Sequence, residues 1–483
     1  KLLSDLLFRM MWTEQPTTLE PPLYPLSKTR LILAACNLYN KLYDRNCRKA
    51  YTANTAWEWT ALPAEHVVFG TESTKSTPDA RFRAALLLQL IPQVLSFDQR
   101  ILIFNRLLQK QMSEHYEDRG HGVRIVVRRK SLYEDAFSKL NPLKGNLKGR
   151  IQISFVDEYG VEEAGIDGGG LFKEFMTSLC KRAFDPQYGM FKEAEGGALY
   201  PNPSSSVVAG VSHLEHFSFL GRILGKAVYE SILVEPQFSK FFLNKVLGRV
   251  NYVDDLMSLD SDLYENLLQL KSLERVEDAD LNFTTIKEEY GEYTSIELIP
   301  NGTHVTVTNE NCLTYIYSLA NYRLNTEISQ QSKAFLRGFR DIIPTSCIRI
   351  FNQEELQNLI GGSEKSFDIV DMAKFTTYST GYHPSQPYIQ EFWKFVDSLD
   401  YADRGHLLRF WTSCSRPPLL GFQTLNPPLC IQKIVIQNDR DRLPTAGTCM
   451  NLLKLPEYSS VVVMKEKLLL ALRSAKNGGF GLS

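Results

Sequence analysis

The chain has 483 residues, of which 43% are hydrophobic and 23% are charged, values typical of an ordinary folded protein of about three domains. The formal net charge of −1 gives no electrostatic reason to expect nucleic acid or an anionic membrane as a partner. No apolar run approaches the ~18–20 residues that a membrane-spanning helix needs. Cysteine and histidine spacings typical of metal sites are missing from the sequence. We therefore expect no membrane span, no metal and no cofactor.

The eight cysteines stand at positions 36, 47, 180, 312, 347, 414, 430 and 449, and none forms a C-x-x-C pair. Sparse, unpaired cysteines favour a reducing compartment with free thiols, so we expect a cytoplasmic or nuclear protein. Most of these thiols should be small buried hydrophobes. Residue 1 is Lys and no secretory signal follows it, which favours a fragment or trimmed copy of a longer protein.

Residues 1–122 are expected to form a helical extension, the end of a longer upstream region. Ser96 and Gln99 have the spacing of a capping box, and an apolar face behind them predicts a helix. Alternating apolar residues at Val123–Val127 then predict a strand, and we place the start of a domain there.

After this strand, Ser131 and Glu134 have the spacing of a second capping box at the start of a helix. Alternation at Ile151–Phe155 predicts another strand. Three glycines at 168–170 then open a helix. They do not have the spacing of a phosphate-binding loop, so close backbone packing is the favoured interpretation.

Apolar periodicity predicts further helices at Phe217–Leu233, Pro236–Leu247 and Asp262–Leu273. The pattern lapses at Thr376–Pro387, where Gly, Ser and Pro gather, and this composition predicts a hinge. A last unit follows, with helices expected at Tyr388–Ser398, Arg404–Ser413 and Ser460–Ser474 and strands at Ile431–Ile436 and Asn451–Leu455.

A candidate nucleophile, Cys449, lies in the stretch RLPTAGTCMNLLKLPEY at Arg442–Tyr458. A loop stiffened by Pro444 and shortened by Gly447 would hold a thiol at a defined place on the surface. On spacing alone, a buried structural cysteine remains the favoured interpretation.

This stretch resembles the active-site loop of HECT ubiquitin ligases, which has the form Leu-Pro-x-x-x-Thr-Cys followed by an apolar strand ending in Leu-Pro. Within that family, it is most similar to the subgroup of ubiquitin-protein ligases three-B and three-C and their fungal counterpart. The likeness extends from Val123 to the last residue. Its other motifs, in order, are EEAGIDGGGLFKEF at Glu162–Phe175, LYPNPSS at Leu199–Ser205, FSFLGRILGKAVYE at Phe217–Glu230, VTNEN at Val307–Asn311 and SRPPLLGF at Ser415–Phe422.

The resemblance implies an α+β, bilobal fold. A large, mostly helical N-lobe would occupy 123–380, with a conjugating-enzyme-binding subdomain at about 248–330. A flexible hinge at 376–387 would join it to a small α/β C-lobe at 387–483. The residues implied for the hinge are Tyr382, His383, Pro384 and Ser385.

The activity implied by the resemblance is that of a ubiquitin-protein ligase that uses a thiol relay. Cys449 would accept ubiquitin from a conjugating enzyme as a thioester and pass it to substrate lysines, building polyubiquitin chains for degradation by the proteasome. The implied partners are therefore ubiquitin, a conjugating enzyme, protein substrates and the proteasome. Many relatives carry His two residues before the cysteine, and Gly447 replaces it here, so we expect no local imidazole base.

Two further groups of residues are implied by the resemblance. Transfer would be supported by the active-site loop and the C-terminal tail through Leu443, Pro444, Thr445, Thr448 and Phe480. The groove for the conjugating enzyme would be lined by Leu263, Leu267, Leu270, Leu273 and Tyr315. Burial in the core of the lobe is an almost equal alternative for each groove residue.

Two alternative functions remain open from the sequence. A thiol hydrolase acting on ubiquitin would need a histidine that meets Cys449 in space, and the sequence offers no obvious candidate. A catalytically inactive scaffold would need neither Cys449 nor Phe480.

Overall fold

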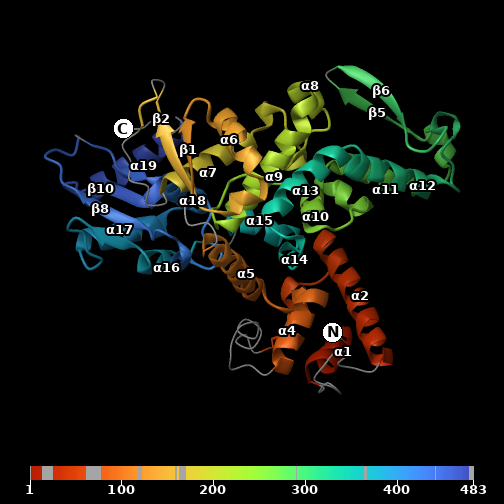
Figure 1. Cartoon of the computed structure of the whole chain (residues 1–483), viewed down its shortest axis with the longest axis horizontal. Coiled ribbons are helices and arrows are strands. Elements are labelled where there is room, and N and C mark those ends of the chain that lie inside the picture. The colour runs from red at the N-terminus through yellow and green to blue at the C-terminus, as the bar shows by residue number, and fades with distance from the viewer. Residues whose placement is uncertain are drawn as a thin grey trace. The chain divides into compact units, whose positions relative to one another are not determined.

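The structure, a computed structural model, describes residues 2–13, 26–60, 62, 78–117, 122–157, 160–162, 170–289, 291–363, 367–440 and 442–477. The fold is α+β, mainly helical with small sheets, as predicted (Figure 1). The chain forms two compact units. The first comprises Lys1–Glu114, Gly189–Phe217 and Phe238–Leu356, and the second comprises His115–Tyr188, Ser218–Gln237 and Gln357–Ser483. Each unit therefore combines segments that are far apart in the sequence.

The first unit begins with a group of helices around its own apolar core. These are α1 (Leu2–Phe8), the π-helix η1 (Arg9–Thr13), α2 (Leu26–Arg48), η2 (Asn54–Trp57), α4 (Pro78–Leu90), η3 (Pro92–Val94) and α5 (Phe97–Glu117). Tyr39, Trp57 and Leu87 are buried in this core. The capping box predicted for α5 is confirmed, because Ser96 N donates to Gln99 Oε1 at 3.1 Å and Gln99 N donates to Ser96 Oγ at 3.3 Å.

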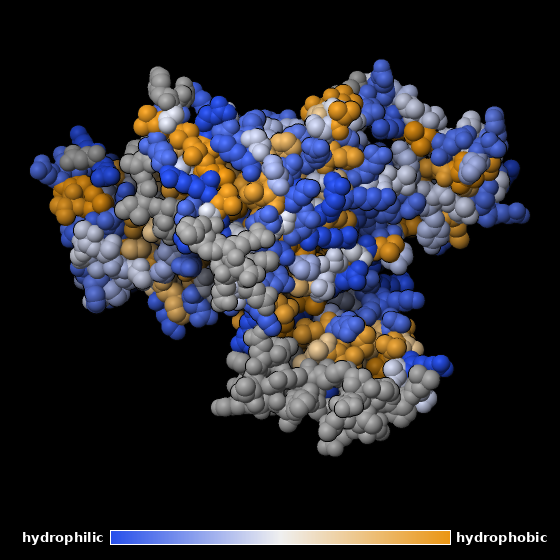
Figure 2. All heavy atoms as spheres, in the orientation of Figure 1, coloured by the Kyte–Doolittle hydropathy of each residue, from blue (hydrophilic) through white to orange (hydrophobic). Residues whose placement is uncertain are grey.

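Two antiparallel hairpins and several helices complete the first unit. The hairpins pair β3 (Phe191–Glu193) with β4 (Leu199–Pro201) and β5 (Thr284–Glu289) with β6 (Glu292–Glu297). The helices are α8 (Ser205–Ala209), α10 (Lys240–Leu247), η8 (Val253–Ser258), α11 (Ser261–Leu270), η9 (Val276–Ala279), η10 (Gly302–His304), α12 (Cys312–Asn321), the π-helix η11 (Tyr322–Thr326), α13 (Ser329–Ile342) and α14 (Thr345–Ile348). Apolar side chains gather on the surface at α8 and the following turn η7 (Gly210–Ser212), where Val207, Val208 and Val211 are exposed (Figure 2).

The second unit contains the two strands predicted from alternation. β1 (Val123–Arg128) and β2 (Ile151–Val156) pair in parallel, which confirms both strands. The associated helices are α6 (Leu132–Leu140), η4 (Asn141–Lys148), α7 (Gly170–Ala183) and η5 (Pro186–Tyr188). Three of the described helices include residues of both units: α5, α9 (His213–Tyr229) and α15 (Gln353–Gly361).

The capping box predicted at the start of α6 is wrong. Ser131 is the N-cap residue, but its side chain makes no capping hydrogen bond to the described residues. Asp135, one turn into the helix, instead accepts from the backbone N of Arg128 at 2.9 Å and from its guanidinium at 2.6 Å. A buried carboxylate paired with arginine therefore fixes this helix start in place of the serine hydroxyl.

The last part of the second unit is a four-stranded sheet with helices. Its strand order is β7 (Thr377–Ser379), β8 (Cys430–Ile434), β10 (Leu452–Pro456) and β9 (Thr445–Gly447); β9 alone is antiparallel to its neighbour. The helices are α16 (Ile369–Lys374), α17 (Pro387–Ser398), α18 (Tyr401–Thr412), η12 (Phe422–Thr424) and α19 (Val461–Asn477). Ile389, Trp411, Ile431 and Leu453 are buried in one shared apolar core.

The predicted hinge at 376–387 begins in the first strand of this sheet. Tyr382 is buried, donates from its hydroxyl to Leu455 O at 3.2 Å and stacks on Tyr388 with ring centroids 5.9 Å apart. His383, Pro384 and Ser385 are exposed. A hinge role for this segment stays a prediction, and the burial of Tyr382 counts against free rotation at that residue.

In the described part of the chain, no helix is both long and apolar enough to cross a bilayer. The same residues contain no group of three His, Cys, Asp or Glu side chains placed to hold a metal ion.

Candidate active site

The predicted nucleophile lies at the tip of a β-hairpin. β9 pairs antiparallel with β10, with Gly447 opposite Leu452 and Thr445 opposite Lys454. The short helical turn η13 (Thr448–Met450) joins the two strands and contains Cys449. The sequence therefore correctly predicted the strand after the cysteine, but it did not predict the strand before it.

The base of the hairpin is closed by side chains from the same motif. Pro444 is buried, and Leu443, Thr445 and Thr448 are half-buried. Tyr458 donates from its hydroxyl to the backbone oxygen of Arg442 at 2.8 Å, which joins the two ends of the motif. The side chain of Cys449 and all of Phe480 lie outside the described residues.

Gly447 does not require the conformational freedom of glycine. Its φ of −101° is available to any residue. A Cβ added there would first meet Leu452 Cβ at 3.8 Å, an ordinary van der Waals contact. The backbone would therefore accept a side chain at this position, so the fold does not require glycine here.

Asn451 ends the turn that contains Cys449 and is hydrogen-bonded through both its side chain and its backbone oxygen. It has a φ of +48°, in the left-handed region that asparagine tolerates better than most residues. It is fully buried, and its Nδ2 donates to Pro427 O at 2.6 Å. Its backbone oxygen accepts from Trp411 Nε1 at 2.7 Å and from Cys430 N at 2.9 Å. Its Oδ1 accepts from Lys173 Nζ at 2.6 Å.

These bonds connect the turn to two helices and a strand. Trp411 lies on α18, is fully buried and stacks on Trp393 at 6.4 Å. Lys173 lies on α7, the helix that begins at the last of the three glycines. Asn451, Trp411 and Lys173 were not predicted from the sequence, although an asparagine two residues after the cysteine is a local signal for a left-handed turn.

Most of the other thiols are in environments that disfavour the thiolate. Burial raises the pKa of the Cys36, Cys47 and Cys414 thiols to about 11 and that of Cys180 to about 12. At neutral pH these cysteines stay protonated and are poor nucleophiles. The seven cysteines other than Cys449 are free, with no disulfide among them.

The residues predicted to bind a conjugating enzyme divide into two groups. Leu267, Leu270 and Tyr315 are buried, and the Tyr315 ring packs edge-on against Phe283 with centroids 5.5 Å apart. These three residues are therefore buried inside the first unit. Leu263 is half-buried and Leu273 is exposed.

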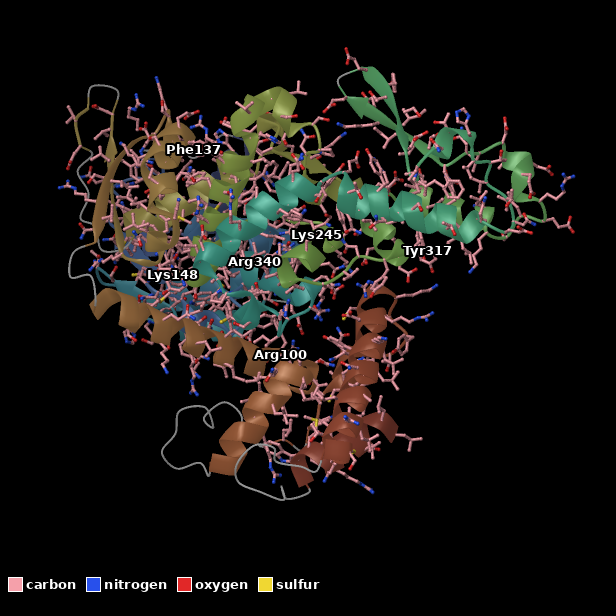
Figure 3. The ribbon with its side chains drawn as sticks, turned by 45° about the vertical axis from the view of Figure 1, so that its right-hand side comes forward. Arg100, Phe137, Lys148, Lys245, Tyr317 and Arg340 are labelled. Atoms are coloured by element: carbon pink, nitrogen blue, oxygen red, sulfur yellow. The ribbon has the colours of Figure 1, made fainter. Side chains whose placement is uncertain are left out.

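Exposed apolar side chains on the same helices were not predicted. Leu268 on α11 and Leu313 and Tyr317 on α12 are all exposed (Figure 3 labels Tyr317). Leu268 directly follows the buried Leu267, and Leu313 and Tyr317 lie four residues apart on α12, outside its buried positions. The apolar spacing that predicts the buried stripe does not include them.

Comparisons with known proteins indicate the family to which the chain is similar. A family model described as "HECT-domain (ubiquitin-transferase)" matches residues 177–483. The chain is 39% identical to the E3 ubiquitin-protein ligase UPL6 of Arabidopsis thaliana over 100% of the chain and 48% of that protein. It is 38% identical to the human ubiquitin-protein ligase E3B, over 92% of the chain and 44% of the relative. A probable E3 ubiquitin protein ligase of Schizosaccharomyces pombe is 44% identical over 80% of the chain and 38% of its own length. The chain thus spans less than half the length of these relatives.

Proposed function

The chain belongs to the HECT ubiquitin-transferase family, and on that premise we propose that it is a ubiquitin-protein ligase whose Cys449 carries ubiquitin as a thioester. One observation carries the proposal. The LPTAGTC motif forms one strand and the tip of a hairpin, so that Cys449 lies in the turn η13 between β9 and β10. Asn451 supports this assignment because it holds the turn through both its backbone and its side chain.

The proposed reaction has two acyl transfers. In the first, the Cys449 sulfur attacks the carbonyl carbon of ubiquitin on the conjugating enzyme, so that one carbon–sulfur bond forms and another breaks. In the second, a substrate lysine amine attacks the same carbon, a carbon–nitrogen bond forms, and the Cys449 thiolate leaves. Thioester exchange conserves the activation of the acyl group, and a thiol is intrinsically nucleophilic near neutral pH.

The proposed partners follow from these steps. Charged conjugating enzyme docks on the subdomain at about 248–330, where Leu273, Leu313 and Tyr317 offer exposed apolar surface. Protein substrates supply the lysine, and the polyubiquitin product directs them to the proteasome. The free thiols of the described residues support action in the reducing cytoplasm or nucleus.

The alternative of a ubiquitin thiol hydrolase needs an imidazole next to Cys449. In the described part of the chain, the hydrogen bonds of His213, His383 and His406 go to near neighbours in sequence, Ser205, Ser385 and Asp403. The partners of these three imidazoles therefore give no support to the hydrolase.

The test is incubation of the protein with conjugating enzyme charged with ubiquitin, followed by electrophoresis with and without reducing agent. We expect a ubiquitin adduct that reducing agent removes, and no adduct with Cys449→Ala. Cys449→Ser should form an oxygen ester that survives reducing agent, which identifies position 449 itself as the acceptor. Cys414→Ala is the matched control and should retain the reducible adduct. A reducible adduct that persists in Cys449→Ala would overturn the assignment.

A further inference from the structure

A buried polar cluster joins α2 to the segment that leads into α11. Arg48, the last residue of α2, donates from Nε to both carboxylate oxygens of Asp255 at 2.9 Å. The two side chains are 6% and 3% exposed. A charge pair this deeply buried is unusual, because both ions lose most of their hydration.

Arg48 contacts residues 250–255, the segment that leads into α11, at three places. In addition to Asp255 on η8, its Nη2 donates to Val250 O at 3.0 Å, and its guanidinium lies 4.9 Å from the centroid of the Tyr252 ring. Asp255 in turn accepts from Tyr252 N at 2.7 Å. One side chain from the N-terminal helices therefore contacts the segment 250–255 at both of its ends.

The same cluster reaches the segment that follows α12. Asn244 on α10 donates to Asp255 Oδ1 at 3.1 Å and to Asn251 Oδ1 at 2.9 Å. Asn325, in the π-helix η11, accepts from Asn251 Nδ2 at 3.4 Å and from Lys245 Nζ at 2.7 Å (Figure 3 labels Lys245). The segment before α11 and the segment after α12 are thus held in one network, and residues 259–321 lie between them in the sequence.

Burial raises the pKa of the Asp255 carboxyl, and the Arg48 charge acts in the opposite direction. Loss of Arg48 alone would therefore leave a buried carboxylate without its counterion. A buried ion pair is weak evidence for stability by itself, and its best-attested use is to specify one arrangement of the surrounding elements.

We propose that Arg48 is a positioning residue for docking of the conjugating enzyme: through Asp255 it lets α2 set the orientation of the region that contains α11 and α12. This proposal rests on the proposed function, in which that enzyme docks on the subdomain at about 248–330. The N-terminal helices then belong to the transfer machinery, and a ligand or modification that displaces α2 would weaken docking without touching Cys449.

The matched control is Arg100 on α5, which forms a second buried ion pair with Glu355 at 2.6 Å, with the side chains 4% and 13% exposed. Its other hydrogen bonds go to Leu95 O and Ile350 O. Figure 3 labels Arg100. Arg48→Met and Arg100→Met should therefore both lower thermal stability, whereas only Arg48→Met should loosen the region around α11 and α12.

Two measurements test this. In amide hydrogen exchange, Arg48→Met should accelerate exchange at 250–270 and 312–326, and Arg100→Met should leave these segments unchanged relative to the rest of the unit. Binding of uncharged conjugating enzyme, measured by titration calorimetry in a Cys449→Ala background, should weaken about fivefold or more with Arg48→Met and less than twofold with Arg100→Met.

A second variant separates positioning from stability. In Arg48→Met with Asp255→Asn, the amide still accepts from Tyr252 N and no charge is left buried, so thermal stability should recover while binding stays weak. Equal binding by Arg48→Met, Arg100→Met and the parent protein would overturn the proposal. Recovery of binding together with stability in the double variant would also overturn it. Because binding is measured without Cys449, a failure of thioester formation would contradict only the proposed function.

Discussion

The turn that contains Cys449 and the cluster at Arg48 are both held by buried polar residues, but by different chemistry. Asn451 is neutral and bonds mostly to backbone and indole groups, with Lys173 as its one charged partner. The second cluster is built on the full charges of Arg48 and Asp255. Neutral hydrogen bonds cost little to bury when every group is paired, and they hold the turn independently of pH. A buried charge pair costs more, and its stabilising effect depends on both partners being present.

The largest effect on stability is expected from breaking a buried ion pair. Arg100→Met should lower the free energy of unfolding by about 3–5 kcal/mol, because Glu355 is left charged without a counterion. The exposed pair Arg124–Glu162, at 2.8 Å with side chains 58% and 55% exposed, is the control. Arg124→Met should cost about 1 kcal/mol or less. Urea unfolding of the two variants measures the difference, and similar losses would contradict the distinction between buried and exposed pairs.

Asn451→Ala should have the next largest effect. It removes two side-chain hydrogen bonds and places alanine in a left-handed conformation, so we expect a loss of about 2–3 kcal/mol in the free energy of unfolding. Thioester formation should slow about 100-fold, because the turn that contains Cys449 loses its fixed position. Asn451→Gly keeps the backbone conformation available and should lose less stability. If both variants retained the parent rate of thioester formation, Asn451 would have no positioning role.

A smaller effect is expected at Trp411. Trp411→Phe removes the indole donor to Asn451 O and should cost about 1–2 kcal/mol in the free energy of unfolding, with slower thioester formation. Trp393→Phe is matched, because Trp393 Nε1 donates to Tyr378 Oη at 2.8 Å and not to the turn. Stopped-flow measurement of thioester formation should separate the two tryptophans. Equal rates in both variants would rule out a role for the indole bond at the site.

The smallest effect is expected from pH. His213 is buried beside Ser205, 3.0 Å from its Oγ, and burial lowers the pKa of His213. The unfolded chain therefore binds a proton at a higher pH than the folded chain, and stability is lost as the pH falls below about 6.5. With His213→Gln, the free energy of unfolding should fall less steeply as the pH decreases. Because one imidazole binds one proton, the slope should change by at most about 1.4 kcal/mol per pH unit. Urea unfolding between pH 7 and pH 5 measures this slope; an unchanged slope would show that His213 does not contribute to it.

The sequence by itself predicted the features that depend on neighbouring residues. Alternation predicted β1 and β2, the spacing of Ser96 and Gln99 predicted the capping box of α5, and the LPTAGTC motif singled out Cys449. Each of these signals is complete within a few residues, so a short stretch of sequence is sufficient to read it.

Only the tertiary structure decided which of several local possibilities is realised. Ser131 has capping-box spacing, yet Asp135 and Arg128 form the bonds at that helix start. Tyr382 lies in a stretch with hinge composition, yet its ring is buried.

The contacts that hold the site were equally out of reach of sequence patterns. Lys173 and Asn451 are 278 positions apart, and Arg48 and Asp255 are 207 positions apart. No periodicity or motif links residues so distant, because their pairing depends on how whole helices and strands pack. The sequence therefore predicted the nucleophile, and the packing of the folded chain selected the residues that hold the turn around it in place.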